Sequence, residues 1–143
     1  MSDPVDALQT ALAAEHAVIW GYAVVGAHVS STVRGQVAAA DAAHRSRRDA
    51  IAGTVRRLGA DPALTRASYE LPFAVTDQPA ALRLAVHLEE GAAAAWRYVV
   101  AATDDRLTRR TAVAALSDAA VRATGWRQLV SPAAATVPFP GQT

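Results

Sequence analysis

The feature that most constrains this chain is a carboxylate in the middle of an apolar helical stripe. Near the N-terminus, core-type residues recur at alternating spacings of three and four, which is the period of an amphipathic α-helix. This stripe consists of Val5, Leu8, Leu12, Glu15, Ile19, Tyr22, Gly26 and Val29. A second stripe, in the latter half of the chain, consists of Leu82, Val86, Glu89, Ala93, Trp96 and Val100. Because an ionised carboxylate inside a helix bundle is costly unless a metal or a cation compensates it, the two stripes predict a polar site in the core.

Composition indicates a compact globular chain and argues against several classes of partner. The 143 residues are 52% hydrophobic and 19% charged, so we expect residues 1–143 to form one folded domain. A net charge of +1 argues against nucleic acid as the main partner. Charges interrupt every apolar stretch before membrane-spanning length, and no secretory signal opens the chain, so we expect no membrane partner and a cytoplasmic location. Without cysteine there is neither a disulfide framework nor a thiolate metal site.

Capping signals and prolines divide the chain into four predicted helices. Asp3-Pro4 and Asp77-Gln78-Pro79 are typical helix starts, whereas residues 60–76 and the proline-containing tail 131–143 lack helical periodicity. The predicted helices span about residues 4–29, 33–58, 77–103 and 105–130. The predicted core includes Leu8, Leu12, Ile19, Tyr22, Ile51, Val55, Leu82, Val86, Trp96 and Leu129. We therefore predict an all-α bundle of two antiparallel helical hairpins joined by a long crossover loop, with the tail lying over the bundle or a neighbouring subunit.

The two predicted hairpins can be aligned with each other by a single ungapped shift along the sequence. The shift places Glu15 on Glu89 and Arg48 on Arg122. It also places Tyr22 on Trp96. Half of the identities are alanine on alanine, so duplication of one hairpin and independent origin both stay open.

Polar residues of all four predicted helices fall near one level of the bundle. The second helix carries Asp41, three residues before His44, on the same seam as Arg48, and the fourth helix carries Asp118 and Arg122. Together with the two glutamates of the apolar stripes, four of these residues form a predicted core polar network. Its members are Glu15, His44, Arg48, Glu89, Asp118 and Arg122.

Two helical hairpins with a glutamate in the middle of the first helix of each resemble the ferritin-like fold. Di-metal members of that superfamily use one glutamate from each of two helices and a Glu-x-x-His motif from each of the other two. Glu15 and Glu89 match the first pair, and Asp41-Ala42-Ala43-His44 is a relaxed form of the third motif. Asp118-Ala119-Ala120-Val121 has valine where the second histidine belongs. The resemblance implies the ferritin-like fold with an incomplete di-metal motif.

Short stretches along nearly the whole chain resemble an actinobacterial ferritin-like family of unknown function. They are Ala14-Glu15-His16-Ala17, His44-Arg45-Ser46-Arg47-Arg48-Asp49, Tyr69-Glu70-Leu71-Pro72, Leu88-Glu89 and Trp126-Arg127. This resemblance implies a four-helix bundle and supplies no activity.

Three interpretations of the polar level follow from these residues. In the first, Glu15 pairs with Arg48 and Glu89 with Arg122, each across its own hairpin, so that no metal is needed and removing either arginine is strongly destabilising. In the second, a metal site for iron or manganese is formed by Glu15, Asp41, His44 and Glu89. In the third, some of these side chains reach solvent.

The function favoured by the sequence is a non-enzymatic helical module that binds a partner or self-associates and holds no cofactor. The incomplete fourth motif and the absence of any other catalytic constellation support it. Trp20, Tyr98 and Trp126 beside the seams suggest a homodimer. The alternative is a metal-binding protein or di-iron oxidoreductase of ferritin-like type.

Overall fold

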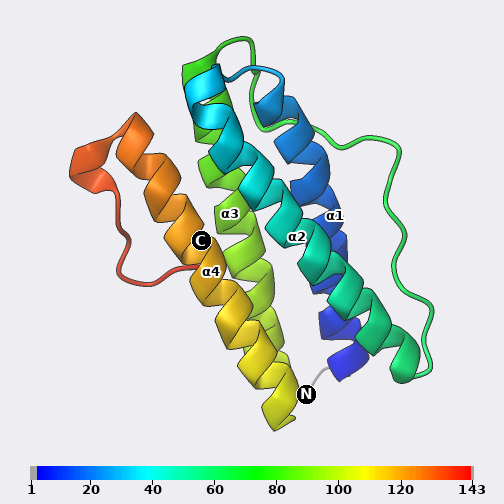
Figure 1. Ribbon diagram of the computed structural model, residues 1–143. Helices are drawn as coiled ribbons and strands as arrows, with labels where there is room; N and C mark the ends of the chain where they lie inside the picture. Colours follow the sequence, from blue (N-terminus) through cyan, green and yellow to red (C-terminus); the bar gives the residue numbers. More distant parts are fainter. Residues whose placement is uncertain (1–2, 143) are drawn as a thin grey trace.

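The computed structural model describes residues 3–142, and four long helices dominate this part of the chain (Figure 1). The helices are α1 (Pro4–Gly26), α2 (Ser31–Arg57), α3 (Gln78–Ala102) and α4 (Arg106–Val130), followed by the short 3-10 helix η1 (Pro132–Ala134). No β-strand occurs among residues 3–142, so the all-α prediction is confirmed. Each long helix begins and ends within three residues of the bounds expected from the sequence. None of the described helices is both long and apolar enough to span a membrane.

Aspartate caps explain why three of the helices start where they do. The side chains of Asp3, Asp77 and Asp105 each accept a hydrogen bond from a backbone amide in the first turn of α1, α3 and α4, at 2.9, 2.9 and 2.7 Å. Such caps satisfy amides that have no partner inside the helix. After α2, Gly59 adopts φ +84°, a left-handed conformation that ends the helix and suits glycine.

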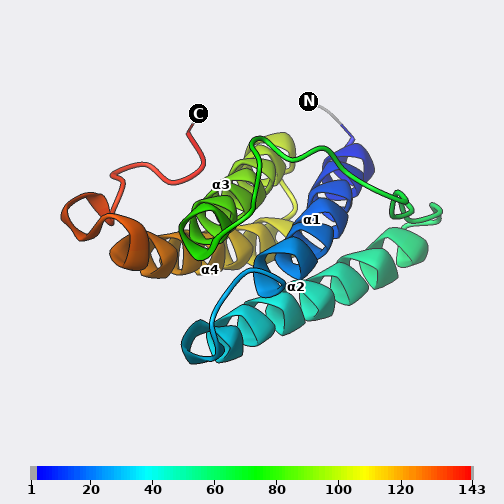
Figure 2. The ribbon, with the colours of Figure 1, turned by 90° about the horizontal axis from the view of Figure 1, so that it is seen from above.

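The helices are packed unevenly around α3. Helix α3 packs against α4 and α1, and α1 also packs against α2. Helices α2 and α4, whose contact would close a regular four-helix ring, are splayed apart, as the view along the bundle in Figure 2 shows. The bundle is therefore open along one side.

Most of the predicted core residues are buried, and one prediction is wrong. The buried members are Leu8, Leu12, Ile19, Tyr22, Ile51, Val55, Leu82 and Trp96, and Val86 is partly buried against them. Leu129 is 49% exposed. The sequence predicts Leu129 as a core residue, but α2 and α4 do not pack on each other, and the end of α4 that carries Leu129 borders solvent.

The crossover 60–76 contains no helix and runs beside α1, to which side chains attach it. Gln9 donates to the carbonyl of Asp61 at 2.6 Å and accepts from the amide of Ala63 at 2.7 Å. Nε2 of His16 lies 2.9 Å from the Ala63 carbonyl oxygen. These contacts give His16 a structural role at the edge of the bundle.

The C-terminal tail lies over α3 and α4, where Val137, Phe139 and Pro140 line a cavity together with residues of both helices. Gly141 makes the closest approach: it has φ +80°, and a Cβ atom added to it would lie 2.8 Å from the carbonyl oxygen of Ala93. Only glycine allows both this conformation and this distance.

Substituting Gly141 should release the tail from α3. In Gly141→Ala the new methyl group would collide with the α3 backbone, so we expect faster cleavage of the tail in limited proteolysis. The matched control is Gly125→Ala within α4, where the added Cβ meets open space and the helix should gain about 0.5–1 kcal/mol. Equal cleavage rates for Gly141→Ala and the unmodified protein would contradict this assignment of the tail.

Candidate functional site

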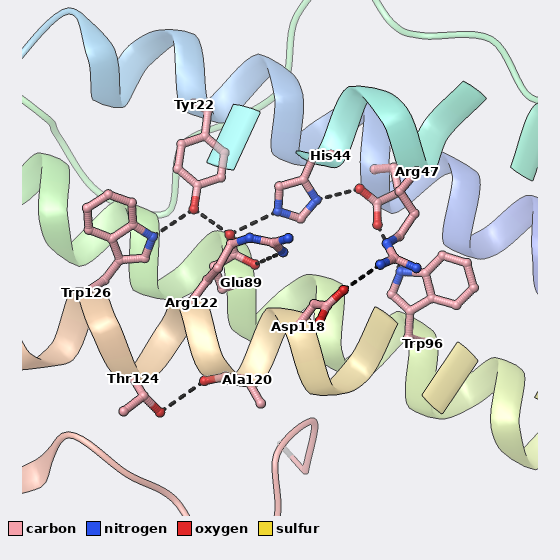
Figure 3. A network of polar contacts seen from close by, with 11 residues as sticks. Tyr22, His44, Arg47, Glu89, Trp96, Asp118, Ala120, Arg122, Thr124 and Trp126 are labelled. Atoms are coloured by element: carbon pink, nitrogen blue, oxygen red, sulfur yellow. Dashed lines mark hydrogen bonds and ion pairs between the residues drawn. The ribbon is translucent and has the colours of Figure 1, made fainter. Parts of the chain in front are cut away.

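The centre of the bundle holds a histidine between two glutamates (Figure 3). Nδ1 of His44 on α2 lies 2.6 Å from Oε2 of Glu15 on α1, and its Nε2 lies 2.9 Å from Oε1 of Glu89 on α3. All three residues are at most 2% exposed. An ionised carboxylate can only accept hydrogen bonds, so with Glu15 and Glu89 ionised both nitrogens of His44 donate and carry a proton. The residue is therefore an imidazolium ion that bridges three helices.

The electrostatics of this cluster favour the charged form of His44. Burial alone lowers the pKa of the imidazole, but the hydrogen bonds to Glu15 and Glu89, together with their negative charges, raise it to about 9. Nη1 of Arg122 lies 3.8 Å from Oε2 of Glu89 and supplies a second positive charge. The two negative charges of Glu15 and Glu89 are thus matched by the positive charges of His44 and Arg122. The Glu15–His44–Glu89 cluster needs no further ion for charge neutrality.

Aromatic donors complete the shell of the cluster. Nε1 of Trp96 donates to Oε1 of Glu15 at 2.9 Å, and the hydroxyl of Tyr22 donates to Oε1 of Glu89 at 2.5 Å. Nε1 of Trp126 in turn donates to the Tyr22 oxygen at 2.9 Å. Burial raises the pKa of the Tyr22 hydroxyl and the charge of Glu89 raises it further, so the hydroxyl remains a neutral donor.

Each hairpin supplies the hydrogen-bond donor for the buried glutamate of the other hairpin. Trp96 and Tyr22 are equivalent under the ungapped shift that aligns the hairpins, as are Glu15 and Glu89. Trp96 of the second hairpin bonds to Glu15 of the first, while Tyr22 of the first bonds to Glu89 of the second. This reciprocal arrangement is what duplication of a single hairpin would produce, and it supports that interpretation. Two positions break the relation: Asp118 is the equivalent of His44, and Arg48, the equivalent of Arg122, contacts Asp49 instead of Glu15.

Two members of the predicted network lie outside the cluster. Arg48 does not reach Glu15: its Nε donates to Asp49 at 2.9 Å on the surface of α2. His44, one turn earlier on the same seam, already occupies the position beside Glu15. Asp118 is 52% exposed and accepts from Arg47 of α2 at 2.7 Å. Substituting Arg48 should therefore have the effect of an ordinary surface change instead of the large loss expected from the sequence.

Of the two ion pairs expected from the sequence, the one between Glu89 and Arg122 is present. The two groups are 3.8 Å apart and make no direct hydrogen bond, and Oε2 of Glu89 has no hydrogen-bond partner among the described residues. Arg122 is 24% exposed, so part of its charge is screened by solvent. His44 is consequently the main counter-ion of both glutamates.

The residues of the alternative metal site do not fit a di-metal centre. The set contains one imidazole, and both of its nitrogens are taken up by hydrogen bonds to Glu15 and Glu89. Asp41 directs its Oδ2 to Arg45 at 2.8 Å, and no contact links it to Glu15. Across residues 3–142, no group of three or more histidine, cysteine, aspartate or glutamate side chains is arranged to hold a metal ion. In this described part of the chain, Oδ1 of Asp41 and Oε2 of Glu89 are buried without a hydrogen-bond partner, but these two oxygens alone do not make a ligand set.

The polar roles of the aromatic residues could have been found in the sequence. Tyr22 lies two helical turns after Glu15, and Trp96 lies two turns after Glu89. Each ring therefore shares a face with a buried carboxylate, and a ring that carries an N–H or O–H group is a natural donor there. The sequence predicts both residues only as core residues, and their burial confirms that part.

Comparison with known proteins identifies similar chains and a family. A crystal structure of a conserved hypothetical protein from Mycobacterium tuberculosis is 39% identical, with a TM-score of 0.86, over 88% of this chain and 96% of that one. The bacterioferritin-related protein of Bacteroides fragilis, described as a dodecameric thioferritin, is 21% identical with a TM-score of 0.76, over 92% of this chain and 86% of that one. At that identity the likeness shows the fold alone, which is the ferritin-like bundle. Among curated proteins, none is significantly similar to this chain. Residues 7–143 match the family described as a domain of unknown function, DUF4439, and the chain therefore belongs to that family.

Proposed function

We propose that this protein is a non-catalytic, ferritin-like binding module whose core is held by the metal-free Glu15–His44–Glu89 cluster. The observation that carries the proposal is the double hydrogen bond of His44, with both ring nitrogens donating to carboxylates at 2.6 and 2.9 Å. A group in this state can neither ligate a metal nor accept a proton. The three residues of the cluster are at most 2% exposed, and Glu89 also lines the small cavity under the C-terminal tail.

The cluster is suited to fixing how the helices meet. Its three members come from α1, α2 and α3, and α2 makes its main helix contact with α1 alone. A buried polar cluster of this kind is satisfied in only one register, because sliding a helix by one turn would leave charges unpaired. The working surface of the module must then lie on the outside of the bundle.

A metal assay tests this proposal directly. We expect protein purified without chelators, and again after loading with iron or manganese, to retain well below one metal ion per chain. The midpoint of thermal unfolding should be the same with and without a chelator, because metal binding to the native state would raise it. Near-stoichiometric metal that is lost in His44→Gln would instead support the metal-binding alternative.

Self-association is a further part of the proposal. The similar Bacteroides fragilis protein is described as dodecameric, which supports assembly in this chain as well. Two of the aromatic residues expected at a homodimer contact have partners inside the chain: Trp126 bonds to Tyr22, and Trp20 packs on Tyr69 with ring centroids 5.8 Å apart. Light scattering at high micromolar concentration checks the prediction, and a purely monomeric protein would contradict it.

A further inference from the structure

The C-terminal half of α2 and the N-terminal half of α4 lie at the same end of the molecule (Figure 1). Side chains of these two segments line a groove of about 880 Å³ on the open side of the bundle. Its lining is mainly apolar. Leu8 and Ile51, each 3% exposed, form the floor, whereas Leu58 and Leu107 on the walls are 52% and 75% exposed. The volume lies in the range of small-molecule sites, about 300–1,000 Å³. Two exposed leucines lining one concave surface favour an apolar occupant.

One end of the groove is bounded at the middle of the bundle. Arg47 of α2 reaches across to Asp118 of α4, with 2.7 Å between Nη2 and Oδ2. The guanidinium also lies 5.9 Å from the ring centre of Trp96. This bridge separates the groove from the region above the buried cluster and leaves the other end open.

The open end carries an arginine that has no acidic partner. Nη2 of Arg57 donates to the hydroxyl of Thr54 at 2.9 Å, and within residues 3–142 no carboxylate lies at ion-pair distance from it. The one acidic residue lining the groove, Asp105, is on the opposite wall and is engaged in capping α4 through the amide of Thr108. Arg57 can therefore offer two parallel N–H groups to a carboxylate.

The dimensions favour a single extended chain over a helix. From Arg47 to Arg57 the α2 axis advances about 15 Å. With carbon–carbon bonds near 1.5 Å, an extended saturated chain gains about 1.25 Å per bond, so roughly twelve carbons span that length. Three turns of a helix about 10 Å across have a volume of about 1,300 Å³, so about a third of such a helix would remain outside the groove, whereas an extended chain fits within it.

We propose that this groove binds one carboxylate with an unbranched chain of about twelve carbons, the head group on Arg57 and the chain over Leu8 and Ile51. The inference rests on the proposed function as a binding module and names its ligand class. The chain would cover Leu58 and Leu107, and the charged head would remain at the open end. Apolar contact supplies the affinity and Arg57 supplies the selection for an anion.

Calorimetric titration with dodecanoate, below the concentration at which it forms micelles, tests the inference. We expect saturable binding of one molecule per chain. Dodecyltrimethylammonium, with the same chain and a cationic head, should bind at least about tenfold more weakly, because a charged hydrogen bond contributes about 1.5–3 kcal/mol. Hexanoate has too short a chain and should not saturate. Equal binding of the two twelve-carbon compounds would indicate non-specific partition and would overturn the proposal.

Three variants locate the site. Arg57→Gln should weaken dodecanoate binding about tenfold, whereas Arg56→Gln, the neighbouring exposed arginine outside the groove, should change it less than about twofold. Ala50→Trp should block the groove and abolish binding while leaving the circular dichroism of the helices unchanged. Equal effects of the two arginine variants would overturn the assignment. The proposal would also be overturned if dodecanoate did not bind and the protein formed a dimer that Ala50→Trp dissociates. That result would show that a second copy of the chain occupies the groove. The metal assay above is independent of dodecanoate, so failure of this inference can be told from failure of the proposed function.

Discussion

Replacing His44 by leucine should lower the free energy of unfolding by about 3–5 kcal/mol, the usual cost of breaking a buried ion pair. The substitution removes the cation between Glu15 and Glu89, which are 1% and 0% exposed. Two carboxylates would then share a low-dielectric site with only the distant guanidinium of Arg122 beside them. Urea unfolding at pH 7, followed by circular dichroism, measures the change.

Two further variants separate charge from packing. Arg48→Ala is the matched control on the same seam of α2, and because its partner Asp49 is on the surface it should behave as an ordinary surface substitution. The triple variant Glu15→Gln, His44→Leu and Glu89→Gln removes the three central charges but keeps acceptors for Trp96 and Tyr22. It should recover most of the loss caused by His44→Leu alone. If His44→Leu is as stable as the unmodified protein, the cluster contributes nothing to the fold.

The second large effect is a loss of stability on the alkaline side. The pKa of His44 is raised from 6.5 to about 9 in the folded protein. A group whose pKa is raised by folding stabilises the native state fully below its unfolded value and loses that contribution as pH rises through the folded value. The stabilisation should therefore be complete below pH 6.5 and should disappear between about pH 6.5 and pH 9. At about 1.36 kcal/mol per pH unit, the interval corresponds to about 3 kcal/mol.

Urea unfolding at a series of pH values from 5 to 10 tests this second prediction. The His44→Leu variant is the control, since its unfolding free energy should lack the decline between about pH 6.5 and 9. If the unfolding free energies of the two proteins changed with pH in parallel, a group other than His44 would be responsible for the alkaline loss of stability. A decline at acid pH alone would have the wrong sign for a histidine stabilised in its charged form.

The helices and the position of the polar site follow from local rules. Asp3, Asp77 and Asp105 cap the helices they precede, and the alternating spacing of three and four places Glu15 and Glu89 inside the bundle. Capping and periodicity depend on residues within one or two turns of each other, so a single sequence contains them in full.

The partner of the buried acids does not follow from local rules. His44 and Arg48 are one turn apart on one seam of α2, and either can face the core according to how the helix is rotated. The contact of α2 with α1 turns His44 inward and leaves Arg48 at the surface. The arginine pairing, inferred because each glutamate and its arginine are separated by the same length of sequence, is therefore wrong for Glu15.

The open side of the bundle is also a tertiary property. The seam of α4 from Thr111 to Leu129 has helical spacing, and the sequence predicts that Leu129 is in the core. Helix crossing angles are set by how whole ridges pack, and periodicity within one helix does not encode them. Because α2 and α4 splay, Leu129 and Asp118 are exposed and the groove exists.

The state of the His44 ring is the most direct test of the central claim that a protonated histidine, and not a metal, neutralises the two buried glutamates. Nitrogen-15 NMR of protein labelled at histidine reports whether each ring nitrogen carries a proton. With the signal of His44 assigned by His44→Gln, we expect both nitrogens to be protonated at pH 7 and to remain so until the pH approaches about 9. A His44 ring that loses a proton near pH 6.5, or one whose nitrogen signal shifts on addition of iron or manganese, would contradict it.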